Sequence, residues 1–286
     1  STKSGSSAGF SGSAGTAIFC VDGRSQLFVD SRYHLQAEQT CAENFDIQKL
    51  GNESVLEPQK WIAAHSEKTL KVGADPFVMS PKEWRRFVNA IGKFGHTLLS
   101  TIPNLVDSVW DNRPNPPKKE IYPLPLKYTG KDSKSKLHDL RKEIRAAGTV
   151  ADSTPDVLLL TMLDEIAWLT NLRGSDIEYN PVFEAYAAIF QDRAICFCHH
   201  PEANLSEYCL GWEFRPYADY LGFLEKLAEK ESVKVWLDPS TITMGTRLAF
   251  ADYQVYEQKS PIVLAKALKN STEIAATTNA HKQAGV

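Results

Sequence analysis

Apolar residues along this chain occur in two patterns: short continuous runs, and longer stretches in which they recur every third or fourth residue. Continuous runs are typical of strands buried on both faces, whereas the longer spacing is typical of helices that bury one face. The run at 157–161 therefore predicts a buried strand. Ser80-Pro81 predicts the start of an amphipathic helix, because Ser80 can cap it and Pro81 needs no amide partner there. Its apolar stripe consists of Trp84, Phe87, Val88 and Ile91.

Strand-like and helix-like segments alternate along most of the chain, which predicts an α/β fold. The first part is predicted to contain strands over 16–21 and 26–30, followed by a helix over 31–41. Helices are predicted in the second part at 133–146, 218–230 and from Asn270-Ser-Thr-Glu273 to about 284, with strands near 185–190, 194–198 and 233–237.

Five prolines at 114, 116, 117, 123 and 125 separate these two parts. A segment so rich in proline can form neither a helix nor a central strand, so it predicts a domain boundary. The two parts also share a short pattern. Gly9-Phe-Ser-Gly-Ser13 precedes a pair of strands in the first part, as Leu172-Arg-Gly-Ser175 does in the second. This similarity hints at two copies of one fold.

Composition narrows the class of protein. A length of 286 residues suggests about two domains, and a hydrophobic content of 43% fits a globular chain. The net charge of −3 gives no basic surplus for nucleic acid, and no apolar run approaches the roughly 20 residues needed to cross a bilayer. Five cysteines are an odd number for a disulfide framework, which favours a reduced, cytoplasmic setting.

One group of residues in the sequence suggests a metal site: Cys196, Cys198, His199, His200 and Cys209. They lack the paired Cys-x-x-Cys spacing of structural zinc sites, and adjacent residues on a strand point to opposite faces. We therefore predict no metal site and no catalytic residue in this chain. A small hydrolase that uses Cys and His remains the less favoured enzymatic alternative.

Residues 164–183 carry the greatest concentration of chemically specific side chains. An apolar segment with Ile166, Trp168 and Leu169 ends in a loop around Gly174 and Pro181, and this loop carries Arg173, Asp176, Tyr179 and Asn180. Apolar periodicity that stops at Gly and Pro indicates a rigid element that delivers a loop to a particular place. This loop is the candidate functional site.

The same segment resembles the signature of the second domain of three-domain Xaa-Pro aminopeptidases (aminopeptidase P), in the creatinase/prolidase superfamily. Four other stretches resemble motifs of that family in the order it requires: Gly9-Phe-Ser-Gly-Ser-Ala-Gly-Thr-Ala17, Asp30-Ser-Arg-Tyr-His-Leu-Gln-Ala37, Val109-Trp-Asp-Asn-Arg-Pro114 and Leu264-Ala-Lys-Ala-Leu-Lys-Asn270. Ser31 departs from the glycine that is usual in the family.

The resemblance implies a fold of two tandem creatinase N-terminal-like domains, each a mixed twisted sheet flanked by helices. The expected first domain is 1–111 and lacks the opening strand, helix and strand of the family. A proline-rich linker at 112–125, a second domain at 126–262 and a connector at 263–286 follow. The family's catalytic domain, of pita-bread fold, is expected to lie outside this chain with its two divalent metals, which we expect to be manganese.

By the same resemblance, the chain is expected to be the non-catalytic N-terminal region of a metal-dependent Xaa-Pro aminopeptidase. That enzyme releases the first residue from peptides whose second residue is proline. The expected partners are the enzyme's own catalytic domain, proline-containing peptides and a second subunit in a homodimer. The competing hypothesis is a peptide- or histone-binding module with a catalytically inactive creatinase-like fold.

Two groups of site residues follow from this interpretation. Arg173, Asp176, Tyr179 and Asn180 are expected to line the substrate pocket, with an Arg173–Asp176 pair inside the loop as the alternative. Arg32 and Tyr33 are expected at an interdomain or subunit contact. For Arg32 the alternative is a pair with Asp30 that holds a strand-to-helix turn.

Overall fold

The computed structural model describes residues 9–65, 68–111, 113–148, 154–201 and 205–285. The chain divides into two compact units between Pro114 and Asn115, within the proline-rich segment. We call them unit 1 and unit 2. None of the helices in the described ranges combines the length and apolar content needed to span a bilayer.

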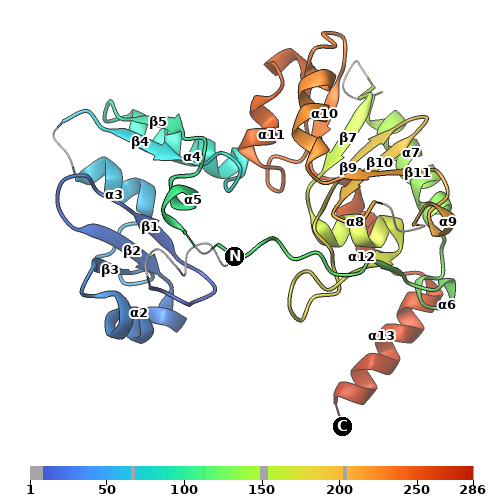
Figure 1. The fold of residues 1–286 in the computed structure, drawn as a ribbon, viewed down its shortest axis with the longest axis horizontal. Helices are drawn as coiled ribbons and strands as arrows, with labels where there is room; N and C mark the ends of the chain where they lie inside the picture. The colour runs from blue at the N-terminus through green and yellow to red at the C-terminus, as the bar shows by residue number, and fades with distance from the viewer. Residues whose placement is uncertain (1–8, 66–67, 112, 149–153, 202–204, 286) are drawn as a thin grey trace. The chain divides into compact units, whose positions relative to one another are not determined.

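The described residues of unit 1 form five strands and the helices that connect them. In chain order its elements are β1 (Thr16–Ile18), β2 (Ser25–Val29), the 3-10 helix η1 (Ser31–Tyr33), α2 (His34–Cys41), β3 (Phe45–Lys49), α3 (Pro58–Ala64), β4 (Lys71–Ala74), α4 (Pro81–Gly92), β5 (Thr97–Ser100) and α5 (Leu105–Val109). β1 pairs antiparallel with β2, and β2 pairs parallel with β3. β4 and β5 form a separate parallel pair (Figure 1).

The predicted helix at Ser80-Pro81 is confirmed as α4. The Ser80 hydroxyl accepts a hydrogen bond from the Glu83 amide at 3.1 Å, and Pro81 occupies the first turn.

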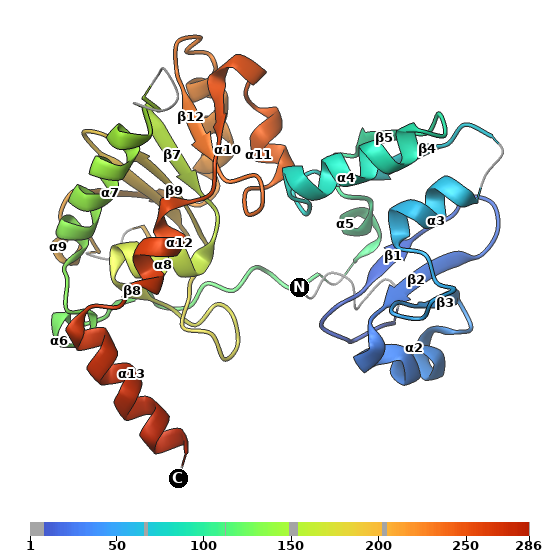
Figure 2. The same ribbon diagram turned by 180° about the vertical axis from the view of Figure 1, so that it is seen from behind.

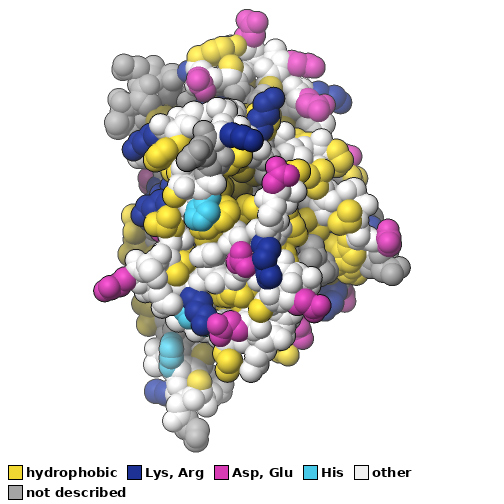
Figure 3. Space-filling view, turned by 90° about the vertical axis from the view of Figure 1, so that its left-hand side faces the viewer, with side chains coloured by type: hydrophobic (Ala, Val, Ile, Leu, Met, Phe, Trp, Pro, Cys, Tyr) yellow, Lys and Arg dark blue, Asp and Glu magenta, His cyan; other side chains and the backbone are white. Residues whose placement is uncertain are grey.

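On the face of unit 1 seen in Figure 3, acidic and basic side chains of the described residues are interspersed.

Unit 2 is built on one six-stranded sheet. In chain order its elements are β6 (Tyr122–Pro123), α6 (Leu126–Thr129), α7 (Ser133–Gly148), β7 (Val157–Leu160), α8 (Leu163–Thr170), β8 (Leu172–Arg173), β9 (Ala185–Phe190), β10 (Ala194–Cys198), α9 (Leu205–Tyr208), β11 (Trp212–Pro216), α10 (Asp219–Ala228), β12 (Val235–Leu237), α11 (Met244–Leu248), the 3-10 helix η2 (Asp252–Gln254), β13 (Val255–Glu257), α12 (Pro261–Ala267) and α13 (Ser271–Ala284). The strand order is β11-β10-β9-β7-β12-β13. The sheet is mixed because β9 runs antiparallel to both of its neighbours.

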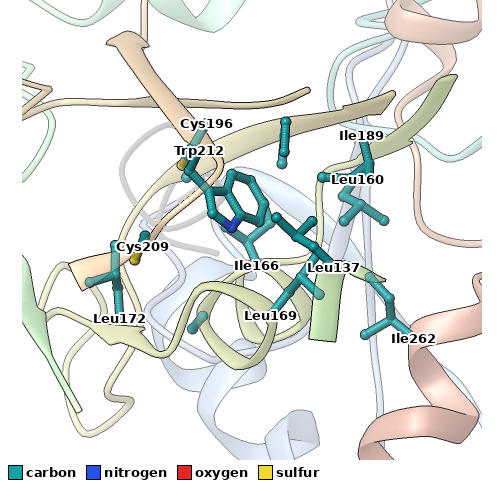
Figure 4. Close-up of a cluster of buried hydrophobic side chains, with 14 of the residues drawn as sticks. Leu137, Leu160, Ile166, Leu169, Leu172, Ile189, Cys196, Cys209, Trp212 and Ile262 are labelled. Carbon is teal, nitrogen blue, oxygen red and sulfur yellow. The ribbon is translucent and has the colours of Figure 1, made fainter. Parts of the chain in front are cut away.

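Helices cover both faces of this sheet, which explains the continuous apolar run of β7. Leu158 and Leu160 belong to the core cluster that contains residues of α7, α8 and α12 (Figure 4). Val157 and Leu159 belong to the opposite cluster, with residues of α10. A strand buried on both faces needs apolar residues at every position, so the prediction of a buried strand at 157–161 is confirmed, as is the mixed α/β fold class.

The last predicted helix, α13, begins with reciprocal capping. The Asn270 side chain accepts from the Glu273 amide at 3.0 Å, and the Glu273 carboxylate accepts from the Asn270 amide at 2.9 Å. None of the residues of α13 is buried, and the helix projects away from the rest of unit 2 (Figure 2). Contacts of its first turn therefore set its direction within the unit.

The two units repeat the same order of elements. The order β1, β2, α2, β3, α3, β4, α4, β5, α5 matches β9, β10, α9, β11, α10, β12, α11, β13, α12. The strand pairs also agree in direction: β9 with β10 is antiparallel, and both β10 with β11 and β12 with β13 are parallel. Phe10 and Leu172, at equivalent points of the shared short pattern, are both fully buried. The structure thus agrees with the internal repeat at which the sequence hints.

Candidate functional site

The candidate site is the loop between β8 and β9, which follows the end of α8. The helix stops at Asn171, which has a φ of 59°, a left-handed conformation that asparagine tolerates better than most residues. The Asn171 amide group donates to the Lys131 carbonyl at 2.9 Å and accepts from the Lys136 ammonium at 2.7 Å. β8 then pairs antiparallel with β6, placing Arg173 opposite Tyr122. The loop therefore starts from a fixed point.

Arg173 turns back onto the helix that precedes it. Its guanidinium donates to the Ala167 carbonyl at 2.6 Å and to the Leu172 carbonyl at 2.8 Å. These bonds satisfy a carbonyl near the end of α8, where a positive charge also interacts favourably with the helix dipole. Burial lowers the pKa of Arg173, and the nearby Tyr122 and Glu273 oppose that shift. Arg173 thus stabilises the scaffold of the loop.

Asp176 closes the base of the loop. Its two carboxylate oxygens accept from the Lys119 amide at 3.0 Å and from the Glu184 amide at 2.8 Å. One carboxylate thereby connects the segment that enters unit 2, at Lys119, to the end of the loop, at Glu184. We call this arrangement the Asp176 clamp. The alternative Arg173–Asp176 pair is wrong, because the two side chains have these separate partners.

Gly174 is required by a close approach inside the same loop. A Cβ atom at this position would lie 2.7 Å from the Cβ of Phe183 and 3.2 Å from the Val182 carbonyl oxygen. Side chains essentially never tolerate the shorter distance, so only glycine allows the two arms of the loop to pack this closely.

The tip of the loop is a tight turn that presents its side chains to solvent. The Asn180 amide donates to the Ile177 carbonyl at 3.1 Å, which closes the turn. Tyr179 adopts a φ of 61° and is 98% exposed. A tyrosine with positive φ is uncommon and is maintained only when the surroundings fix it. The turn therefore holds an aromatic ring outward.

A hollow of about 430 Å³ lies against this tip. It is lined by Lys119, Tyr122, Gly174, Ser175, Ile177, Glu178, Tyr179, Asn180 and Pro181. Of the four predicted pocket residues, Tyr179 and Asn180 thus meet at the hollow, whereas Arg173 and Asp176 support the loop from behind. Sequence reasoning missed Lys119 and Tyr122. They lie more than 50 residues upstream, and the β6–β8 pairing brings Tyr122 to the loop while the Asp176 clamp brings Lys119.

Two histidines after β10 brace the loop and the entering segment. His199 Nε2 lies 3.1 Å from a Glu184 carboxylate oxygen, and its ring stacks on Tyr217 at 4.4 Å between centroids. His200 Nε2 lies 2.9 Å from the Lys118 carbonyl oxygen, to which it donates. The adjacent histidines thus have different partners, although both lie beyond the end of β10 rather than on the strand.

The cysteines near these histidines lie in the core. Cys196, Cys198 and Cys209 are all buried. Burial raises the pKa of Cys209 to about 12, so it is a thiol at neutral pH. Among the described residues, no three His, Cys, Asp or Glu side chains come together as a metal site.

Arg32 and Tyr33 both have partners within unit 1. Arg32 donates to the two carboxylate oxygens of Asp30 at 3.0 and 2.7 Å, which lowers the pKa of Asp30. The Tyr33 hydroxyl lies 2.5 Å from the Ser13 hydroxyl, and the Tyr33 ring meets Phe10 edge-on. The alternative in which an Arg–Asp pair holds the turn is therefore realised. The Arg32 side chain remains 64% exposed, so the proposed contact role stays a prediction.

Comparison with known proteins gives consistent relatives. A family model described as the creatinase/prolidase N-terminal domain matches residues 112–273. The chain is 38% identical over 291 residues to a probable Xaa-Pro aminopeptidase P of Botryotinia fuckeliana, which covers 97% of this chain and 43% of that protein. Aminopeptidase P2 of Arabidopsis thaliana is 34% identical over 309 residues, covering 96% of this chain and 42% of that protein. The chain thus spans less than half the length of these relatives.

A solved structure shows the same fold. X-prolyl aminopeptidase from Caenorhabditis elegans, described as a cytosolic enzyme with a di-nuclear active site, superimposes with a TM-score of 0.87. The two sequences are 24% identical, and the match covers 98% of this chain and 46% of the other. With the family model matching more than half of its residues, this chain belongs to the creatinase/prolidase N-terminal domain family, and its homologues are Xaa-Pro aminopeptidase P proteins.

Proposed function

We propose that this chain forms the non-catalytic N-terminal region of a metal-dependent Xaa-Pro aminopeptidase in the cytoplasm. Its relatives of that name match nearly all of this chain but are more than twice as long. In the proposed enzyme, a further domain removes the N-terminal residue from peptides with proline second. The chain's own role is to border the peptide-binding cleft.

The observation that carries this proposal is the tip of the β8–β9 loop. The Asp176 clamp fixes the loop from behind, while the turn holds Tyr179 outward beside the hollow. A loop held this firmly loses little conformational entropy when a ligand binds. The Glu178 carboxylate suits a peptide ammonium group, and Tyr179 offers an apolar ring with a polar end. These are the groups needed beside the free amine and first side chain of a peptide.

Catalysis itself is assigned to the further domain. That domain would hold two divalent metals, manganese in our proposal, which would supply Lewis-acid chemistry for peptide hydrolysis. The described residues of this chain do not fit such a pair, because their carboxylates and imidazoles do not converge. No chemical step is therefore assigned to this chain. Arg32 and Tyr33 are proposed to contribute to an interdomain or homodimer contact.

A chimera tests the role of the loop. This chain is joined to the remaining part of the Botryotinia fuckeliana relative, and hydrolysis of a fluorogenic Xaa-Pro peptide is measured with Mn²⁺. Tyr179→Ala is expected to raise KM roughly 3- to 10-fold, the effect of losing one aromatic contact. Tyr253→Ala is the matched control, because this tyrosine is also exposed, at 59%, but lies in η2, away from the loop.

Two results contradict the proposal. Equal KM values for both tyrosine variants would show that the loop tip does not border the peptide. Mn²⁺-dependent hydrolysis by the 286-residue chain alone would place the catalytic site within it. Titration of the chain with histone-tail peptides tests the competing hypothesis of a peptide- or histone-binding module. Tight binding of these peptides would favour the binding module over the peptidase region.

A further inference from the structure

Residues 114–119, Pro114-Asn-Pro-Pro-Lys-Lys119, are rich in proline, and we call them the Pro-x-x-Pro segment. Residues 114–121 belong to no helix or strand (Figure 1). Pro114, Asn115 and Pro116 are exposed, and Pro117 is half-buried. Among the residues that the structure describes, none forms a hydrogen bond with residues 114–117. The carbonyl groups of these four residues are therefore open to another molecule.

The prolines further along the chain have a different role. Pro123 lies in β6 and is paired with Leu172 of β8, and the Leu124 amide donates to the Asn171 carbonyl at 2.8 Å. Pro125 immediately precedes the first turn of α6. The fold of unit 2 thus makes use of the prolines at 123 and 125. It gives no such reason for the prolines at 114, 116 and 117.

Local sterics favour one backbone conformation in the Pro-x-x-Pro segment. Each proline fixes its own φ near about −65°, and a residue that precedes a proline avoids the helical region. Between them, these two rules restrict every residue from Arg113 to Pro117. With no helix or turn over these residues, the favoured conformation is polyproline II. A segment preset in this way loses little conformational entropy when it binds to an aromatic-lined groove.

The two ends of the segment differ in the charge that they offer. Before the prolines, the Arg113 guanidinium is paired with the Asp107 carboxylate at 2.8 Å and lies over the Trp110 ring. After the prolines, Lys118 and Lys119 are exposed, and neither forms an ion pair with another described residue. The available positive charge therefore follows the prolines, in the order Pro-x-x-Pro-x-Lys. A segment that acts only as a stiff spacer does not need this order.

The two lysines are held to unit 2 by their backbone atoms. The Lys118 carbonyl accepts from His200 Nε2 at 2.9 Å, and the Lys119 amide donates to the Asp176 carboxylate at 3.0 Å. Because neither bond uses a lysine side chain, both ammonium groups stay available. The end of the segment is thus fixed while its charged groups remain open to a partner.

A polyproline II helix has three residues per turn, so residues three apart share an edge. One edge of the segment therefore carries Pro114 and Pro117, and a second carries Pro116 and Lys119. The third edge carries Asn115 and Lys118. Two adjacent edges thus combine three prolines with one lysine.

We propose that the Pro-x-x-Pro segment is a polyproline II ligand for a second protein, whose groove is lined by aromatic side chains and has an acidic rim. This is the chemistry of SH3 domains. The three prolines pack against the aromatic groove, and the Lys119 ammonium pairs with a carboxylate of the rim. The edge of Asn115 and Lys118 faces away from the groove.

The probe is an isolated SH3 domain that selects Pro-x-x-Pro-x-Lys or Pro-x-x-Pro-x-Arg peptides. Isothermal titration calorimetry with the 286-residue chain is expected to show one domain bound per chain. The free peptide of residues 113–120 is expected to bind within about threefold of the chain, because its prolines preset the same conformation. An SH3 domain that selects a basic residue before the prolines is expected to bind the chain at least about tenfold more weakly.

Two matched pairs of variants locate the binding. Pro117→Ala is expected to weaken binding about tenfold, because an apolar contact and a fixed φ are both lost, whereas Asn115→Ala on the far edge should leave it unchanged. Lys119→Ala is expected to weaken binding roughly two- to fivefold, the effect of losing one exposed ion pair. Lys118→Ala makes the same change on the far edge and should have little effect.

Three outcomes would overturn the proposal. Binding of the free peptide without binding of the chain would show that the segment is covered in the folded protein. No binding of either would show that the segment is not a ligand of such a groove. Equal effects of Lys118→Ala and Lys119→Ala, or full binding by Pro117→Ala, would contradict the assigned edges. These measurements record the binding of a domain and not peptide hydrolysis, so they are independent of the proposed function.

Discussion

Lys136 provides a sharp test of the energetics of unit 2, because it is charged yet only 3% exposed. Its ammonium group donates to the Trp168 carbonyl at 2.8 Å and to the Asn171 side chain at 2.7 Å, and lies 4.1 Å from the centroid of the Trp168 ring. Burial lowers the pKa of Lys136 from 10.5 to about 8, although the Glu273 carboxylate opposes the shift. We predict that this lysine makes stability depend on pH.

The sign follows from proton binding in the two states. Between pH 8 and 10.5 the unfolded chain keeps the Lys136 proton, whereas the folded chain releases it. The unfolded state therefore binds more protons, and the free energy of unfolding rises with pH through this window. At about 1.4 kcal/mol per pKa unit, the shift corresponds to a gain of roughly 3 kcal/mol. Below pH 8 this gain is absent, because both states carry the proton.

Lys136→Met removes the titration while retaining an unbranched side chain of similar length. Urea unfolding followed by circular dichroism at pH 7, 8, 9 and 10 gives the free energy of unfolding of both proteins. The difference, wild type minus variant, is expected to rise by roughly 2–3 kcal/mol from pH 7 to 10. Lys134→Met is the control, because it makes the same change at an exposed lysine of the same helix. A difference that is constant or falls over this range would refute the reasoning.

Three further predictions concern the loop and the thiols. Gly174→Ala is expected to destabilise unit 2 by about 1–3 kcal/mol, because its Cβ would overpack against Phe183. Gly222→Ala, at an open position of α10, is the control and should raise the melting temperature slightly. Equal melting temperatures of the two variants would contradict the close approach at Gly174. Asp176→Ala leaves the amides of Lys119 and Glu184 without their carboxylate acceptor, and it is expected to lower the free energy of unfolding by about 1–3 kcal/mol. An unchanged free energy of unfolding in urea would show that the Asp176 clamp does not stabilise the fold. Native iodoacetamide labelling at pH 7.5, read by peptide mass spectrometry, should modify Cys20 before the buried Cys209; the reverse order would contradict the burial of that thiol.

Short-range features were readable from the sequence because their causes are local. Ser80-Pro81 starts a helix and Asn270 with Glu273 caps another, since each motif satisfies amides within the same turn. The apolar run at 157–161 implied a strand buried on both faces, and the prolines before residue 126 marked the region where the two units divide. The family was also readable from the sequence, because the motif around Gly174 and the other family motifs occur along the chain in the order that the family requires.

The tertiary structure decided the roles of individual polar side chains. Asp176 was expected at the pocket but bonds to Lys119, 57 residues away, and Arg173 turns back to α8. Lys136 meets Trp168 only because α7 packs beside α8. No local pattern specifies such partners, since a buried polar group takes whichever donor or acceptor the packed core brings within reach.

The division of the unit 1 sheet is the clearest case of the same limit. The sequence predicts a strand in the region of β1 but none at β4, and it carries no information on how these strands pair, because strand pairing joins residues far apart in the chain. Only the comparison of the two units showed that β1 and β4, which occupy the places of β9 and β12 in the order of elements, belong to separate sheets among the described residues. The sequence by itself therefore determined the locally specified elements and the family, whereas long-range pairing and packing determined the order of strands in the sheets and the partners of Arg173, Asp176 and Lys136.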